Sequence, residues 1–393
     1  MPSAKALEVG RRVAYHRSMH RMTQLQLADA AGIHVGTLRK IERGARGAGD
    51  AVLDALADAL GIDVTRLHRD QDRAASRIHD AMPALAALLA GHDDPDDGPV
   101  RALPLLRTAV SAAVSHRLES QYVRIMRVGP GLLSELLRAL STGTAESRPE
   151  LARLLVSACR AVDAVAYKHG ATDLSARLID LMRWAARRAD DAVTTATVEY
   201  VRTEVYFAAR AHAAGLRALE RAIDHAPPPN GTAAAASRGA LHMRAAVIAG
   251  RAGDHHSATS HMKHADRLAR SVPEAVYDGT AVGPDSVRVH EVSLAVSLGE
   301  GHLQRALDIA QEWAPPKGLP AERRSSFHIE VARAQLWAGR PDDAFESLKT
   351  ARRIAPQHAR EHRWVREDIG TLRRLKRADA ASLTHFAEWC GAI

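Results

Sequence analysis

The spacing of apolar residues predicts that the chain is helical almost throughout, beginning close to the N-terminus. Val9 and Val13 place apolar side chains on one face of a first helix, and Arg17 is expected to face outward. Thr23, followed three residues later by Gln26, forms a capping-box pattern. The sequence therefore predicts that a second helix begins at this point.

Two more helices and a closing segment complete the first predicted domain. Gly32 suits the left-handed conformation in which a chain leaves one helix for the next, and Leu38 and Ile41 supply the inward face of a third helix. A fourth helix is predicted over residues 50–60, with a glycine directly after it. Residues 1–68 are therefore expected to form a small five-helix domain, closed by three apolar side chains: Ile62, Val64 and Leu67.

A linker is predicted over residues 69–98. Residues 70–90 have a helical composition, so a helix is expected to leave the first domain. The segment Gly91–Pro99 is acidic, lacks apolar side chains and contains two prolines, which is typical of a connection between domains. Residues 99–393 are then expected to form the last domain.

Beyond this linker, helical patterns alternate with turn signals, which indicates a repeat architecture. The clearest unit is Ser325–Pro356, where small residues such as Ala332 and Ala344 would let two helices approach closely. Two segments, residues 276–293 and 319–333, are expected to form irregular loops. Turns between helix pairs are predicted at glycines spaced by 38 to 48 residues: Gly170, Gly215, Gly253, Gly301 and Gly339.

Composition agrees with a helical protein and narrows its class. Hydrophobic residues make up 46% of the 393 positions and aromatic residues only 4%, which favours helices over strands. The chain has two widely separated cysteines, Cys159 and Cys390, expected to be reduced thiols. No apolar run reaches the length of a membrane span, and no secretory signal is present. A cytoplasmic protein without membrane contact is therefore expected.

Positive charge is concentrated near the N-terminus. The formal net charge is +8, and residues 1–49 carry nine Lys or Arg against three acidic residues, an excess of six. Basicity alone is weak evidence of nucleic-acid binding, but a positive face on a small helical domain is what docking to DNA requires.

Residues 23–33 and 38–44 together resemble the helix-turn-helix of the Cro/repressor (xenobiotic-response-element) family. The motif is distributed over Gln24, the Leu27–Ala28 pair, Gly32 and the run Ile41–Gly44, and the resemblance covers about residues 7–68. It implies binding to double-stranded DNA, with the helix that follows His34 in the major groove.

The resemblance also implies roles for individual side chains. Val35 and Gly36 stand where the family usually has polar residues, so Arg39 is the best candidate for a bidentate contact to guanine. The alternative is that Arg39 and Lys40 are only the solvated face of a helix. The predicted base-reading residues are His34, Thr37, Arg39 and Lys40, and the predicted phosphate contacts are Gln24, Arg43 and Arg46.

The later helix pairs resemble degenerate tetratricopeptide repeats. The fold class expected is therefore all-α: a helix-turn-helix domain followed by an α-solenoid, which offers a concave surface to a partner. This combination resembles bacterial quorum-sensing peptide receptors and a group of actinobacterial regulators. It implies a homodimer on a palindromic operator and a peptide or small-molecule effector. Peptide receptors commonly use asparagines as a clamp, but this chain has only Asn230.

Candidate effector residues are the polar and aromatic groups on the first helices of the late repeats. Tryptophan with arginine and histidine suits an acidic or aromatic ligand, or a peptide carboxylate. The alternative is that these side chains only join neighbouring repeats. The candidates are Tyr277, His290, Glu291, Trp313, His328, Glu330, Arg333 and Trp337.

Other classes of function lack support in the sequence. No phosphate-binding loop, nucleophile elbow or paired-carboxylate motif is present, so an enzyme and a cofactor are not expected. Four histidines lie close together without a carboxylate or cysteine at ligand spacing, so no metal site is predicted: His255, His256, His261 and His264. The rival hypothesis is an interaction protein whose repeats dock a partner protein while the first domain only localises it.

Overall fold

The computed structural model describes residues 4–62, 64–67, 71–375 and 380–392. Contacts divide the chain into two compact units, residues 1–77 and 78–393. The sequence placed the first boundary at residue 68, which with residues 69 and 70 lies outside the described residues. The division at residue 77 falls inside the predicted linker helix. In the described residues, no helix has the combination of length and apolarity that crossing a membrane requires.

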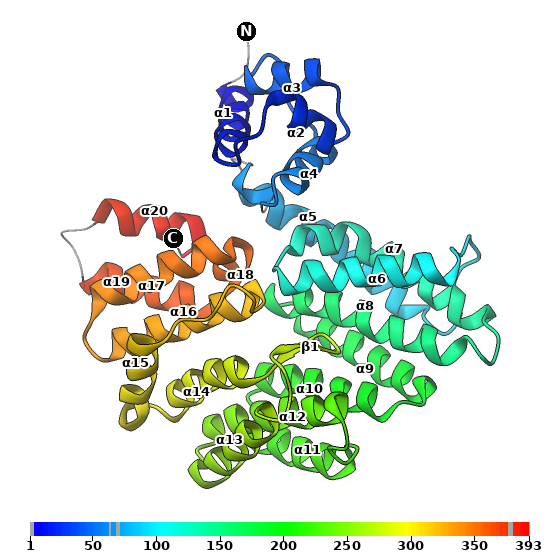
Figure 1. Ribbon diagram of the computed structural model, residues 1–393, viewed down its shortest axis with the longest axis vertical. Helices are drawn as coiled ribbons and strands as arrows, with labels where there is room; N and C mark the ends of the chain where they lie inside the picture. Colours follow the sequence, from blue (N-terminus) through cyan, green and yellow to red (C-terminus); the bar gives the residue numbers. More distant parts are fainter. Residues whose placement is uncertain (1–3, 63, 68–70, 376–379, 393) are drawn as a thin grey trace. The chain divides into compact units, whose positions relative to one another are not determined.

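The N-terminal unit is a bundle of short helices around one apolar core (Figure 1). Its elements are α1 (Ala4–Met19), α2 (Gln24–Ala30), α3 (Val35–Glu42), α4 (Asp50–Ala59) and the 3₁₀ helix η1 (Val64–Arg66). The positions that the apolar pattern assigned to the interior are buried, which confirms the predicted bundle. The core residues are Val9, Val13, Leu27, Ala28, Leu38, Ile41, Leu53, Leu56, Ala57, Leu60, Ile62, Val64 and Leu67.

Two glycines allow α1 to lie directly against the end of α3. A Cβ atom on Gly10 would lie 2.1 Å from the carbonyl oxygen of Ile41, which is far inside van der Waals contact. A Cβ atom on Gly44, whose φ is +71°, would lie 2.7 Å from the Cα of Leu7. The close approach of α1 to α3 therefore depends on the absence of side chains at both sites.

The helix α5 (Gln71–Ala90) joins the C-terminal unit through its second half. Leu85 and Leu89 are buried, and the guanidinium of Arg177 donates to the carbonyl of Ala86 at 3.4 Å. The predicted acidic linker continues along this unit rather than away from it, because Arg138 donates to the carbonyl of Pro99 at 3.4 Å.

The C-terminal unit consists of helix pairs and one β-hairpin. The helices that precede the hairpin are α6 (Leu103–Leu118), α7 (Tyr122–Thr142), α8 (Arg148–Lys168), α9 (Thr172–Ala189), α10 (Ala192–Ala208), α11 (His212–His225), α12 (Thr232–Ala252) and α13 (His255–Ala269). The elements that follow are β1 (Ala275–Tyr277), β2 (Thr280–Val282), α14 (Pro284–Leu298), η2 (Glu300–His302), α15 (Leu303–Glu312), α16 (Ala321–Trp337), α17 (Pro341–Ile354), α18 (Pro356–Glu361), α19 (Arg363–Leu375) and α20 (Ala380–Cys390).

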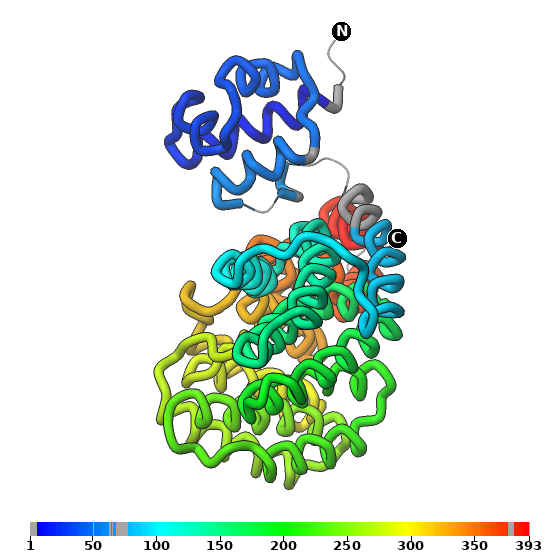
Figure 2. The backbone as a smooth tube through the Cα atoms, turned by 90° about the vertical axis from the view of Figure 1, so that its right-hand side faces the viewer, coloured from blue at the N-terminus to red at the C-terminus, as the bar shows by residue number. Residues whose placement is uncertain are grey.

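The even-numbered helices form a continuous inner layer. α6, α8, α10, α12, α14 and α16 contact one another in this order, and each from α8 onward also packs against the odd-numbered helix that follows it. In Figure 1 the hairpin strand β1 lies among the helices of this layer, and Figure 2 shows the same backbone turned by 90°. Successive helix pairs that share one inner layer are the arrangement expected of a solenoid, so the predicted all-α class is confirmed.

The two ends of the inner layer meet. α16 contacts α6, and the hydroxyl of Tyr122 at the start of α7 lies 3.0 Å from Nδ1 of His358 on α18. The backbone N–H of Val123 donates to the side-chain oxygen of Gln357, also at 3.0 Å. These residues are separated by more than 230 positions in the sequence. The solenoid is therefore closed by direct hydrogen bonds from α7, near its start, to α18, near its end.

One sequence expectation about turns is wrong. Gly215 lies inside α11, where a Cβ would be 2.4 Å from Cδ1 of Ile248 and 2.8 Å from Cβ of Tyr206, so this glycine allows a close approach between helices and does not form a turn. The chain turns instead at Arg210, whose φ is +54°. Gly301 lies in η2, between α14 and α15 as expected, although the residue with positive φ there is Gly299. The other predicted turn glycines have positive φ, as expected: Gly170, Gly253 and Gly339.

The expectation of irregular loops over residues 276–293 and 319–333 is also wrong for most of both segments. α14 begins at Pro284, and α16 begins directly after Pro320. A proline in or just before the first helical turn starts a helix, because the N–H that it lacks would have no partner there. These prolines therefore mark helix starts and not breaks.

The β-hairpin is the departure from an all-helical chain. Val276 pairs with Ala281 and Tyr277 with Thr280 across an antiparallel ladder. The two residues between the strands, Asp278 and Gly279, have φ of +44° and +75°. Asp-Gly between β-branched and aromatic residues is a strong hairpin signal, since both turn positions require positive φ.

Candidate nucleic-acid interface and effector region

α2 and α3 form a helix–turn–helix pair whose ends are fixed by local hydrogen bonds. The Thr23 hydroxyl accepts from the N–H of Gln26 at 3.2 Å, and the Gln26 side chain accepts from the N–H of Thr23 at 2.8 Å. This is the reciprocal capping box that the sequence predicts. Gly32, with φ of +63°, lies in the turn between the helices. The pair is therefore held at both the start of α2 and the turn into α3.

His34 caps α3 with its ring. Its Nδ1 accepts a hydrogen bond from the N–H of Gly36 at 3.0 Å, which satisfies one amide of the first helical turn. A Cβ on Gly36 would lie 3.1 Å from the same nitrogen, so a glycine there leaves room for the cap. The sequence analysis assigned His34 to base reading only, and the structure gives the side chain this second role.

The other predicted base-reading side chains lie on α3 away from the core. Arg39 and Lys40 are exposed, and Thr37 is half-buried. Val35 packs against the apolar core of the domain, so its methyl groups are used in folding. The outer surface of α3 therefore presents two cations and one hydroxyl group within four residues.

A hydrogen-bonded network joins Arg39 to the interior of the domain. The Glu42 carboxylate accepts from Arg17 at 2.7 and 3.2 Å and from Nε2 of Gln24 at 2.6 Å. The oxygen of Gln24 in turn faces Nε of Arg39 at 3.4 Å. Glu42 thus pairs within the domain. Arg17 does not face outward as expected, because its side chain is only 18% exposed and holds α1 to α3.

The predicted phosphate contacts lie around this network. Gln24 is half-buried at the start of α2, whereas Arg43 and Arg46 are exposed after α3. The backbone N–H of Arg46 donates to the carbonyl of Lys40 at 3.2 Å, and Nε of Arg43 donates to that of Arg39 at 3.2 Å. The segment after α3 is therefore held against the end of the helix, and its two guanidinium-bearing side chains remain accessible.

Two of the predicted effector residues lie on facing inner helices of the C-terminal unit. His290 on α14 is buried and donates from Nδ1 to the carbonyl of Ser286 at 2.8 Å, and its burial lowers the pKa of the imidazole to about 3. Glu330 on α16 accepts from the Ser293 hydroxyl. Burial raises the pKa of the Glu330 carboxyl to about 7, against the opposing effect of that hydroxyl.

Arg333 is engaged in contacts between helices. Its guanidinium donates to Asp368 at 2.9 Å and to Glu367 at 2.6 Å, both on α19. The same group lies 4.5 Å from the ring centre of Trp364 and 5.5 Å from that of Trp337, which is 48% exposed. Arg333 therefore joins α16 to α19, and the neighbouring Trp337 presents an open aromatic face.

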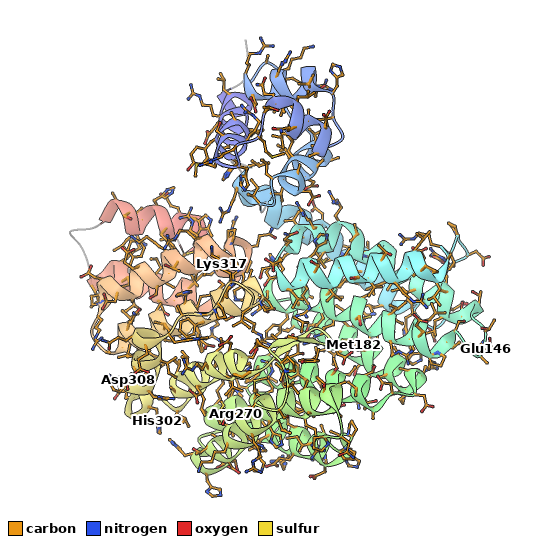
Figure 3. All side chains as sticks on the ribbon, in the orientation of Figure 1. Glu146, Met182, Arg270, His302, Asp308 and Lys317 are labelled. Atoms are coloured by element: carbon orange, nitrogen blue, oxygen red, sulfur yellow. The ribbon has the colours of Figure 1, made fainter. Side chains whose placement is uncertain are left out.

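The remaining effector candidates are spread over the unit. Glu291 pairs with Arg305 at 2.9 Å, and both line a surface hollow of about 330 Å³. Arg270, which is labelled in Figure 3, lines the same hollow. Trp313 and His328 both pack edge-on against Phe327, at ring-centre distances of 5.4 and 5.3 Å. Tyr277 belongs to the hairpin and donates its hydroxyl hydrogen to the carbonyl of Pro273 at 2.8 Å. The eight candidates do not form one pocket.

A group of buried arginines that the sequence analysis missed holds the hairpin tip. Arg160 on α8 donates to the carbonyl of Asp278 at 2.5 Å and to the hydroxyl of Thr280 at 2.7 Å. Arg117 on α6 donates to the carbonyl of Gly279. The signal available in the sequence was arginine at positions where the surrounding helix pattern calls for an apolar residue, since both side chains are at most 7% exposed.

The histidine cluster involves a residue that the sequence analysis did not include. His242 on α12 has its Nδ1 at 3.0 Å from Nδ1 of His261, and its ring stacks on that of His264 at 5.1 Å. Burial, with the neighbouring His261 and His264, lowers the pKa of His242 to about 3. Within the described residues, no group of histidine, cysteine or acidic side chains has a geometry that would hold a metal ion.

Comparison with known proteins identifies the class of the N-terminal unit. Residues 17–67 match the helix-turn-helix family. The first domain is thus a helix-turn-helix domain, as its capped helices and turn also indicate. This match is to a DNA-binding family and not to a family of enzymes, and it covers only this part of the chain. No curated protein matches the chain.

The solved structures that match this chain do so at low sequence identity and low TM-score. PlcR of Bacillus thuringiensis, solved with the peptide PapR7 and DNA, is 14% identical, with 67% of this chain and 94% of that chain covered and a TM-score of 0.28. The competence regulator ComR from Streptococcus vestibularis, in its apo form, is 12% identical, with 96% and 99% covered and a TM-score of 0.30. A mutant of PrgX is 9% identical, with 97% and 99% covered and a TM-score of 0.29.

Proposed function

We propose that the chain is a sequence-specific, double-stranded-DNA-binding transcription regulator that acts as a homodimer and responds to an effector bound by its helical repeats. The observation that carries this proposal is the helix-turn-helix pair, with Arg39 and Lys40 exposed on α3 and Arg39 next to the Gln24–Glu42–Arg17 network. A network of this kind limits the rotamers of a side chain before it meets DNA, which lowers the entropy lost on binding.

Each side chain of this interface has a distinct expected role. Arg39 would donate two hydrogen bonds to a guanine, and Thr37 and Lys40 would contact neighbouring bases or the sugar–phosphate chain. Arg43 and Arg46 would neutralise phosphates, which gives affinity without sequence preference. In a homodimer, two such domains would meet half-sites about one helical turn apart on a palindromic operator.

The test is selection of bound duplexes from a random library with the full chain, followed by titration of the winning sequence. We expect a palindromic site to be enriched. Arg39→Ala should then weaken binding by about 1–3 kcal/mol and relax one base position in each half-site. Arg46→Ala should weaken binding to all sequences alike and reduce the salt dependence.

Two results would contradict the proposal. A selection that enriches no sequence would refute sequence-specific recognition. An Arg39→Ala variant with unchanged affinity and site preference would remove Arg39 from the interface. Arg305→Ala is the matched control, because this exposed arginine lies on α15 and pairs only with Glu291 among the contacts described above.

A further inference from the structure

Arginine side chains from three inner helices of the C-terminal unit converge on a phenol that belongs to a fourth. The guanidinium of Arg323 on α16 donates to the hydroxyl of Tyr200 on α10 at 2.7 Å. Arg244 on α12 lies 4.4 Å from the centre of the Tyr200 ring, and Arg160 on α8 lies 5.4 Å from it. Three cations thus surround a group that carries no charge in its ordinary form.

The neighbourhood of this phenol contains more positive than negative charge. Two further cations, Arg117 and Lys168, lie close enough to act on the same groups. The carboxyl groups near these five cations do not balance them, because the pKa values of Asp163, Glu330 and Asp278 are raised, which favours their neutral form. The other two carboxyl groups are Glu204 and Glu322.

Protonation equilibria reflect the same imbalance. Burial and the neighbouring Glu204 raise the pKa of Asp163 well above its usual value. Burial, followed by the charge of Arg117, lowers the pKa of Arg160 to about 9. Burial alone would raise the pKa of Tyr200, but Arg244, Arg323 and Arg160 outweigh it and lower that pKa to about 8. The environment therefore favours a negative charge at the position that the uncharged Tyr200 hydroxyl occupies.

Hydrogen-bonding capacity in the cluster is also left unused. Nε of Arg244 and Nε of Arg117 are buried without a hydrogen-bond partner in the described residues, and so is one carboxylate oxygen of Glu204. The guanidinium of Arg244 approaches Glu204 only to 3.9 Å. Buried donors of this kind are rare in folded proteins unless a ligand or a water molecule completes them.

One side of the cluster is in contact with solvent. The side chains of Arg244, Glu204 and Glu322 are 19%, 18% and 20% exposed. The β-hairpin lies next to Tyr200, and together they line a cavity of only about 10 Å³. This volume holds little more than one water molecule. Any larger ligand must therefore move the hairpin tip.

The uncharged backbone carbonyl oxygens of the hairpin tip already accept hydrogen bonds from two arginines of the cluster. Arg160 and Arg117 donate to the backbone carbonyls of Asp278 and Gly279. A Cβ on Gly279 would lie 2.9 Å from Nη2 of Arg117 and 3.2 Å from Nη1 of Arg160, so the glycine is what lets both arginines reach the turn. Charged oxygens form stronger hydrogen bonds with guanidinium groups than carbonyls do.

We propose that the inner layer holds a binding site for a small ligand bearing a carboxylate or phosphate group, formed by Arg160, Arg244 and Arg323 around Tyr200 and covered by the hairpin of residues 275–282. The anion would take hydrogen bonds from Arg244 and Arg323 and displace the hairpin carbonyls from Arg160. The assignment of this ligand as the effector rests on the proposed function. The existence of the site does not depend on that function.

The first experiment measures anion binding by calorimetry on the full chain at constant ionic strength. Inorganic phosphate and acetate serve as probes, one for each class of anion, with chloride as the background salt. We expect saturable binding of at least one probe, about ten-fold weaker in Arg244→Gln, because a charge-assisted donor is lost. The matched control Arg305→Gln should bind as the wild type does. Equal affinity in Arg244→Gln and wild type would overturn the proposal.

A second variant keeps the test decisive if Arg244→Gln does not fold. Gly279→Ala removes no arginine, but its Cβ would lie too close to the ends of Arg117 and Arg160, so the hydrogen bonds from these arginines to the hairpin carbonyls should weaken. It should bind the same probe more tightly than wild type, whereas a purely structural cluster would show no gain. If neither phosphate nor acetate binds to wild type or to Gly279→Ala, the proposed site is also overturned.

A final measurement separates this proposal from the proposed function. DNA affinity is titrated with and without the bound probe. A change in DNA affinity that Arg244→Gln abolishes supports the effector role. Anion binding that leaves DNA affinity unchanged would retain the site but remove its role in regulation. Loss of DNA recognition in the selection experiment would refute the regulator and leave the calorimetric result intact.

Discussion

Replacing Gly10 with alanine tests how closely α1 must approach α3 for the DNA-binding domain to be stable. An added Cβ would lie 2.1 Å from the carbonyl oxygen of Ile41 and 2.8 Å from that of Glu42. Ordinary contacts of this type begin near 3.4 Å. α1 must therefore move away from α3 by about 1 Å, and the neighbouring core residues Val9 and Val13 must move with it.

The expected magnitude is the balance of two effects. In an exposed helix interior, glycine to alanine stabilises by about 1 kcal/mol. Overpacking against rigid backbone costs about 1–3 kcal/mol and sometimes more, since a carbonyl cannot rotate away as a side chain can. For a contact this short the cost of overpacking should lie in the upper part of its range, about 2–3 kcal/mol. Subtracting the gain of about 1 kcal/mol leaves a net destabilisation of about 1–2 kcal/mol.

Hydrogen exchange followed by mass spectrometry on the full chain measures this change in the first domain alone. Amides of α1 and α3 should exchange about ten-fold faster in Gly10→Ala, as a loss of that size implies. Gly47→Ala is the control, because a Cβ there would meet no atom within 4 Å. Slower exchange in Gly10→Ala than in wild type would show that α1 does not depend on this approach, and would refute the reasoning.

Three further changes follow from the contacts described. Glu42→Gln should weaken DNA binding and speed exchange in α1 and α3, because it removes the charge that holds Arg17, whose side chain is 18% exposed; unchanged DNA titrations would count against the network. Arg333→Ala should destabilise the α16–α19 contact by about 3 kcal/mol by leaving Asp368 unpaired, seen as faster exchange in α19; unaltered exchange there would contradict it. Glu330 has a folded pKa of about 7, above its ordinary value of 4.5, so its contribution to stability falls as the pH rises from 4.5 through 7. Glu330→Gln should therefore gain thermal stability relative to wild type between pH 5 and pH 8, and a difference independent of pH would refute this assignment.

The first domain could be predicted closely because its signals are local. The capping box at Thr23, the turn at Gly32 and the buried positions Leu38 and Ile41 each depend on a few neighbouring residues. The family match over residues 17–67 agrees with this reading. What the sequence did not show was the orientation of Arg17, since an arginine beside an apolar stripe looks the same whether it is solvated or paired across 25 residues.

The repeats could be predicted as a class but not in detail. Gly215 and Gly170 look alike in the sequence, yet one lies inside a helix and the other in a turn, because only the neighbours of Gly215 on α10 and α12 reveal a close approach. The inner cluster was missed for the same reason. Arg160 and Tyr200 belong to different helices, and no spacing along the chain brings them together.

The hydrogen bonds that join α7 to α18 have a consequence for how the repeats fold and evolve. In an open array each repeat contacts only its neighbours, so terminal repeats can fray, and repeats can be gained or lost. Here the bond between Tyr122 and His358 makes the last helices partners of the first. The array should therefore melt as one cooperative unit, and its number of repeats is fixed, because adding or deleting one would separate these two residues.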